Sequence, residues 1–234
     1  IEGIPTIEVH RGTASAWRLR QGEDIAVRAA VTGVERVHIA AAPLVFVGHG
    51  IHAPERGHDD YKGVDLTGKV AVVLISDPVP LDSADGRRHM SQHGHSRAKY
   101  EQAARRGALG VLIVHEADVV GYGWNAAADS NTATMYDVLR ERPADVHPPL
   151  EAWISQPAAE RLLAAAGQDL AALRERARDP RFTPVELAGL TLSVDLRLRT
   201  SIIRSHNVVA RLEGTAWPDD TLIYSAHWDH IGSQ

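Results

Sequence analysis

The sequence predicts a mixed α/β fold, and three observations support this. Short apolar runs of strand length recur along the chain, and segments with helical spacing alternate with several of them. Residues 70–114 form a strand–helix–strand unit long enough for a crossover between parallel strands. The composition is ordinary for a globular protein, with 234 residues, 44% hydrophobic and 24% charged, which excludes disorder along the whole chain.

The amino-terminal part is expected to be mostly β-structure. Apolar residues alternate with polar ones in three short segments, which predicts strands with one buried face at 7–9, 25–27 and 37–39. Residues 43–48 form an apolar run that ends at Gly48, which indicates a buried strand. The Gly, Pro and charged residues of 49–60 then predict a loop.

The middle of the chain contains the crossover unit. A turn at 64–69 is expected to lead into a buried strand at 70–75. A polar loop at 79–95, a helix at 96–106 and another buried strand at 108–114 are expected to follow. Ser96 is expected to cap the helix, because a serine hydroxyl can accept a bond from a free amide of the first turn. Gly107 is expected to end it.

The last third predicts further elements of both kinds. Residues 117–149 are expected to be one long irregular segment. Ser155, Gln156 and Pro157 open a predicted helix that ends at Gly167. A second helix is expected at 168–178. Strands are expected at 190–198, 207–212 and 221–226, with a turn at 216–220 between the last two.

Charge and composition narrow the function classes. The net charge of −5 disfavours a nucleic-acid binder, and no apolar run is long enough to span a membrane. The chain has no cysteine and 13 histidines, so disulfides and thiolate metal sites are excluded. Any transition-metal site must therefore use His, Asp and Glu.

The sharpest candidate site is His227 with Asp229, which directly follow the apolar stretch 221–226. The carboxyl ends of strands open onto the ligand crevice of α/β sheets. A neutral imidazole can bind zinc through one nitrogen, and a carboxylate can accept a bond from the other. The alternative is a surface His and Asp at the end of a strand.

The surroundings of this pair resemble the M28 family of zinc peptidases. The resemblance rests on Asn207-Val208-Val209-Ala210-Arg211-Leu212-Glu213-Gly214 and on Ser225-Ala226-His227-Trp228-Asp229-His230-Ile231-Gly232. It implies that His227 ligates one of two zinc ions and that Asp229 orients His227. The family's other ligands and its general base lie downstream of this motif, so the sequence is expected to be a truncated, inactive fragment of an aminopeptidase-like enzyme that binds no zinc tightly by itself.

The upstream region resembles a protease-associated (PA) domain, which one branch of these peptidases carries ahead of the first metal-binding strand. The similarity lies in residues 42–51, in residues 59–70, and in the helix near Tyr100 that leads into 107–113. It implies a PA-like β-rich domain at 35–200, preceded by a segment at 1–34. Residues 201–234 would then be the first strands of an incomplete peptidase sheet.

The resemblance also implies a peptide substrate, a two-zinc activated water and an extracytoplasmic location, periplasmic or secreted. The strands at 201–234 are apolar on both faces, so we expect them to be exposed and either to associate or to be poorly ordered. Two alternatives are a noncatalytic PA-type binding module and a nonenzymatic, histidine-rich metal-binding protein.

Other candidate residues lie in loops. Tyr122 and Trp124 are flanked by glycines and are either a substrate wall or aromatic caps on the core. The histidines at 49, 52 and 58, with Asp59 and Asp60, are either a loose metal site or part of a solvated loop with Asp turns. The histidines at 89, 93 and 95 have ligand spacing only in a helix, and Gly94 disfavours one.

Overall fold

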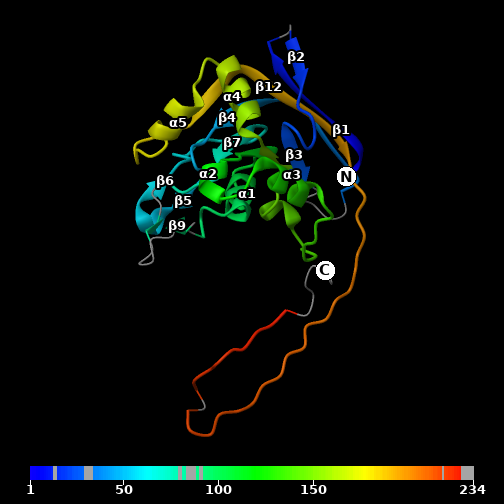
Figure 1. The fold of residues 1–234 in the computed structure, drawn as a ribbon, viewed down its shortest axis with the longest axis vertical. Helices are drawn as coiled ribbons and strands as arrows, with labels where there is room; N and C mark the ends of the chain where they lie inside the picture. Colours follow the sequence, from blue (N-terminus) through cyan, green and yellow to red (C-terminus); the bar gives the residue numbers. More distant parts are fainter. Residues whose placement is uncertain are drawn as a thin grey trace. The chain divides into compact units, whose positions relative to one another are not determined.

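The structure is a computed structural model that describes residues 1–12, 15–28, 34–78, 81–82, 88–89, 92–217 and 219–227. By its internal contacts the chain divides into two units, 1–201 and 202–234. The first unit has an eight-stranded mixed sheet with helices on both faces (Figure 1). The predicted α/β class is therefore confirmed.

Four parallel strands form the centre of this sheet: β4 (Arg36–Phe46), β7 (Val70–Leu74), β10 (Gly110–Val114) and β11 (Leu150–Ile154). Antiparallel strands flank them: β12 (Val185–Arg197), β1 (Glu2–Arg11) and β2 (Ser15–Arg18) beyond β4, and β3 (Ile25–Arg28) beside β11. The complete order is β2-β1-β12-β4-β7-β10-β11-β3. Strands β1, β2 and β3 thus join the same sheet as β4.

Helices cover the two faces of the sheet because its central strands are apolar on both sides. Every residue of β7, β10 and β11 is buried, as expected for parallel strands between helical layers. Val72 belongs to the core cluster that includes α4 (Gln156–Ala165) and α5 (Leu170–Arg176). Its neighbour Val73 belongs to the cluster with α1 (Ser96–Ala104) and α3 (Trp124–Thr132).

Three loop predictions need correction. Residues 117–149 are not irregular throughout, because α2 (Ala117–Val120), α3 and the 3-10 turn η2 (Pro143–Asp145) lie within them. Alanines at 126–128 favour helix, and two of them are buried. The loop 49–60 contains β5 (His52–Ala53), η1 (Pro54–Arg56) and β6 (His58–Asp59), and β8 (Leu81–Asp82) pairs with β9 (Arg88–His89) within 79–95.

The helix ends are partly as predicted. Gly107 follows α1 in the left-handed region, at φ +75°, and its amide donates to Ala104 O, as expected of a terminating glycine. Ser96 is the first residue of α1, and the cap position is His95, whose side chain makes no capping bond. The predicted serine cap is therefore wrong by one residue.

The second unit has no strand in its described residues, 202–217 and 219–227, and all of these residues are exposed. The expected strands at 207–212 and 221–226 are therefore not formed, since a strand needs a neighbour to accept its backbone hydrogen bonds. The predicted exposure of the apolar side chains is confirmed, with exposed fractions from 64% at Ile203 to 97% at Leu212.

Among the described residues, none of the helices combines the length and the apolar character needed to cross a bilayer.

One partly buried contact connects the segment after α3 to the sheet. His147 donates to two carboxylates, with Nδ1 2.7 Å from Glu151 Oε1 and Nε2 2.7 Å from Asp137 Oδ2. Glu151 on β11 is buried and also pairs with Arg28 of β3, at 3.2 Å. The hydrogen bond to Glu151 and the nearby Asp137 raise the pKa of His147, although partial burial opposes this.

We expect His147→Gln to lower the free energy of unfolding by about 1–3 kcal/mol at pH 6. The stabilisation from a histidine with a raised pKa is fully present below its unfolded pKa and is lost as the pH rises through the folded pKa. The difference between wild type and variant in urea titrations should therefore shrink from pH 6 to pH 9. The exposed His206→Gln is the control, and a difference that is constant with pH would contradict the assignment.

Candidate functional site

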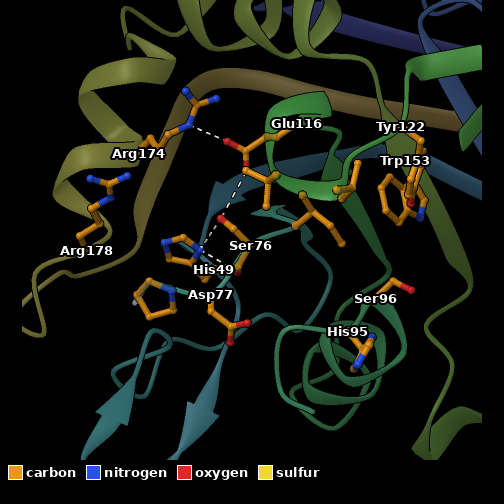
Figure 2. Close-up of a pocket in the computed structure, with 14 residues that line it drawn as sticks. His49, Ser76, Asp77, His95, Ser96, Glu116, Tyr122, Trp153, Arg174 and Arg178 are labelled. Atoms are coloured by element: carbon orange, nitrogen blue, oxygen red, sulfur yellow. Dashed lines mark hydrogen bonds and ion pairs between the residues drawn. The ribbon is translucent and has the colours of Figure 1, made fainter. Parts of the chain in front are cut away.

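A pocket of about 360 Å³ lies at the carboxyl ends of the parallel strands (Figure 2). His49 follows β4, Ser76 and Asp77 follow β7, and Glu116 follows β10. Helices α2 and α5 complete its sides. Ligands of open α/β sheets bind at this edge, so the topology favours a ligand site here.

A buried lysine links two of the loops that line the pocket. Lys99 of α1 is completely buried, and its Nζ donates to His49 O at 2.5 Å and to Ser76 O at 3.2 Å. These two carbonyls follow the ends of β4 and β7, so one side chain fixes both loops. Burial lowers the pKa of Lys99 to about 8, although nearby carboxylates such as Asp77 favour its charged form.

His49 is oriented by the loop after β7. Its Nδ1 lies 2.8 Å from Ser76 O, and because a carbonyl can only accept, this nitrogen carries a proton. Burial, and then the charge of Lys99, lower the pKa of His49 to about 4, so the ring is neutral at pH 7. The lone pair is therefore on Nε2, which is buried and has no hydrogen-bond partner among the described residues.

Glu116 gives the same wall a carboxyl group. It is 3% exposed, its Oε1 lies 2.6 Å from Arg174 Nε, and its Oε2 accepts from Ser76 Oγ at 3.4 Å. Burial raises its pKa, and the charge and hydrogen bond of Arg174 act against that rise. The pocket thus combines a neutral imidazole with a paired glutamate and arginine.

Three aromatic residues near the pocket, including the predicted Tyr122 and Trp124, surround one buried histidine. The ring centroid of His115 lies 5.7 Å from those of Tyr122 and Trp124 and 6.0 Å from that of Trp153. Tyr122 is 42% exposed and lines the pocket. Trp124 starts α3, packs against the core and donates from Nε1 to Gly22 O at 2.8 Å.

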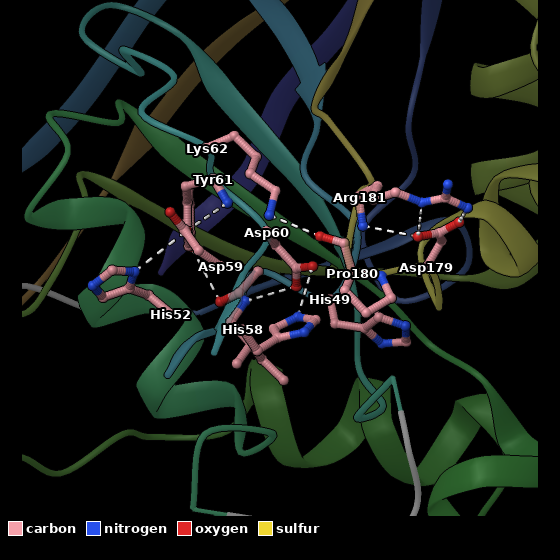
Figure 3. Close-up of polar contacts among 12 residues, drawn as sticks. His49, His52, His58, Asp59, Asp60, Tyr61, Lys62, Asp179, Pro180 and Arg181 are labelled. Atoms are coloured by element: carbon pink, nitrogen blue, oxygen red, sulfur yellow. Dashed lines mark hydrogen bonds and ion pairs between the residues drawn. The ribbon is translucent and has the colours of Figure 1, made fainter. Parts of the chain in front are cut away.

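In the histidine-rich loop 49–60, two histidines each pair with an aspartate (Figure 3). His58 Nε2 lies 2.9 Å from Asp60 Oδ1, and His52 Nδ1 lies 3.3 Å from Asp59 Oδ1. The same aspartates accept backbone amides, from Ile51 to Asp60 and from Tyr61 to Asp59. This arrangement orders the loop against Gly50, whose φ of +64° and closeness to Val73 leave no room for a side chain.

The other predicted metal ligands are dispersed or not described. His227 is exposed, and Asp229 lies outside the described residues. His93 bonds Glu55 at 2.9 Å, His95 lines the pocket, and the side chain of His89 is not described. Within the described ranges, no three His, Asp or Glu side chains form a group able to hold a metal ion.

The sequence analysis did not single out Lys99, Ser76 or Glu116. A usable signal exists for two of them, because Ser76 and Glu116 come one or two residues after an apolar run that forms a parallel strand. Lys99 carries no such signal, since it stands within a helix between Ala98 and Tyr100.

Comparison with known proteins gives only weak structural likeness. No protein-family profile matches the chain, and no curated protein matches it. Among solved structures, an aminopeptidase from Aneurinibacillus sp. strain AM-1 aligns with 18% identity and a TM-score of 0.37. The alignment covers 82% of this chain and 30% of that chain, so this chain spans less than a third of that protein's length.

Proposed function

We propose that this chain belongs to a zinc-dependent exopeptidase of the aminopeptidase-like M28 type. In this proposal residues 35–200 are the PA-like accessory domain, and 201–234 begin the catalytic domain. His227 is a zinc ligand and Asp229 orients it. The substrate is a peptide, and the enzyme acts outside the cytoplasm.

The observation that carries the proposal is the apolar stretch 221–226 followed at once by His227 and Asp229. The exposure of the same stretch supports it, with Leu222, Ile223 and Tyr224 between 78% and 89% exposed. Side chains of this kind normally belong to a core. In a complete peptidase sheet, these side chains would be buried in the core.

The described residues do not fit a complete zinc site. Zinc sites use three or four protein ligands, and His227 has no ligand cluster around it among these residues. We therefore assign no catalytic step to this chain. In the proposed enzyme, His227, oriented by Asp229, would contribute one ligand to zinc, and the metal would supply Lewis-acid activation of water for peptide hydrolysis.

We expect the full-length gene product, loaded with zinc, to release amino acids from short peptides, and a chelator to abolish this. His227→Ala should lower kcat/KM by about 10²-fold or more and reduce the zinc content measured by atomic absorption. His206→Ala, an exposed histidine in the same segment, is the matched control and should change neither.

Hydrolysis that persists in His227→Ala with full zinc content would contradict the ligand role. Absence of any chelator-sensitive hydrolysis would instead favour a noncatalytic binding module of the PA type. The two outcomes are separate, because the first concerns one residue and the second the whole activity.

A further inference from the structure

The pocket beside β4, β7 and β10 contains an unused hydrogen-bond acceptor. His49 is 2% exposed, and its Nε2 makes no hydrogen bond to any described residue. A buried polar atom without a partner costs free energy, so its presence in the wall of a cavity calls for a group that binds there. The Nδ1 contact to Ser76 O fixes Nε2 as an acceptor.

The charges around the pocket argue against an ionic ligand. Arg174 pairs with Glu116 at 2.6 Å, and Arg178 pairs with Glu175 at 3.2 Å. Lys99, beneath the floor, is engaged by two carbonyls. An anion would have to compete with these partners for its cation and would also meet Asp77, which lines the pocket, whereas a cation would have to approach the basic groups.

The rest of the wall is mixed, with the polar residues Asp77, His95 and Ser96 beside a set of apolar and aromatic side chains. Ile75, Val119, Val120, Tyr122 and Trp153 line the pocket. Figure 2 shows Tyr122 and Trp153 together on one side of the drawn residues, with His49 and Ser76 on another. A volume of about 360 Å³ is at the lower end for ligand pockets, which suits a molecule with one ring.

We propose that this pocket binds a small uncharged molecule with an aromatic ring and one hydroxyl or N–H group, which donates its proton to His49 Nε2. The ring packs against Tyr122 and Trp153. This site lies within residues 49–178 and needs neither zinc nor His227, so it stands apart from the proposed peptidase activity.

The test compares three probes that share a ring and differ in one group, titrated into the full chain and followed by ¹H–¹⁵N NMR. 4-Methylphenol should bind with a Kd in the millimolar range. 4-Methylanisole, its methyl ether, lacks the proton and should bind about tenfold more weakly. 4-Methylbenzoate should also bind more weakly. The ¹⁵N resonance of the unprotonated His49 nitrogen should shift with the phenol alone.

Two variants locate the site. His49→Asn keeps an N–H near the Nδ1 position and removes the Nε2 acceptor, so the phenol should bind no better than the ether. Val119→Trp, at a half-exposed position of α2 on the pocket wall, should abolish binding of both. His52→Asn, outside the pocket, is the control and should change nothing.

Equal affinities for phenol and ether, tighter binding of the benzoate, or unchanged phenol binding in His49→Asn would overturn the proposal. Failure of all three probes to bind at about ten times the expected Kd would also overturn it. Should His49→Asn not fold, the phenol–ether difference in the wild type and its loss in Val119→Trp decide the question.

Discussion

Replacing Lys99 with methionine should lower the free energy of unfolding by about 2–4 kcal/mol. Methionine keeps the unbranched stem, so the main change is the loss of the ammonium group. His49 O then loses the buried donor that satisfies it, and the buried carboxylates nearby lose a positive neighbour. Urea unfolding followed by circular dichroism measures the change.

The chain contains a matched control for this substitution. Lys62 also donates to a backbone carbonyl, Pro180 O at 2.8 Å, but its side chain is exposed. Water can replace that bond, so Lys62→Met should change the free energy of unfolding by no more than about 0.5 kcal/mol. Equal effects of the two substitutions would show that burial of Lys99 is not what makes it important.

The pH dependence gives a second measure of the same contact. The folded pKa of Lys99, about 8, is below its usual value of 10.5, so between these values the unfolded chain binds more protons. Stability from this group therefore rises with pH across that window. The stability difference between wild type and Lys99→Met should grow from pH 8 to pH 10, and a difference that does not grow would contradict the lowered pKa.

Lys99 also shows where the sequence stops predicting the structure. Apolar runs such as 70–75 and 108–114 predict the buried parallel strands, because a strand covered on both faces needs apolar residues at successive positions. The burial of Lys99 depends on which loops lie above α1, and no local pattern records that. The pairing of β1 with β12 joins segments more than 170 residues apart, and local periodicity likewise carries no information about it.

The same limit explains why the two strands predicted near the carboxyl terminus are not formed. Apolar and β-branched residues at 207–212 and 221–226 predict a preference for extended backbone. A strand also requires a hydrogen-bonding neighbour, and the described residues 202–227 have none in a ladder. The sequence did not predict the pocket for a related reason, since its walls come from six segments (49, 75–78, 95–96, 116–122, 153 and 174–178) that meet only after the sheet has formed.

We expect residues 202–234 to mediate self-association of the chain, so deleting them should abolish that association and leave the stability of residues 1–201 unchanged. Both hydrophobic clusters are built from residues between Ile7 and Leu198, so the deletion removes no core side chain. The deleted segment carries an exposed apolar set in which Val209 is 88% and Ile223 is 80% exposed. Such segments pair with other chains when they find no partner within their own.

Sedimentation velocity over a range of concentrations measures the association, and urea unfolding measures the stability. A 234-residue Val209→Asp, Ile223→Asp variant separates composition from length, because it keeps the length of the segment and replaces two of its apolar side chains with charged ones. It should be monomeric with an unchanged urea midpoint. If the wild-type chain is monomeric throughout, or if the shortened chain associates as strongly, the apolar segment is not an association surface. A lower midpoint for 1–201 would instead mean that the segment stabilises the first unit.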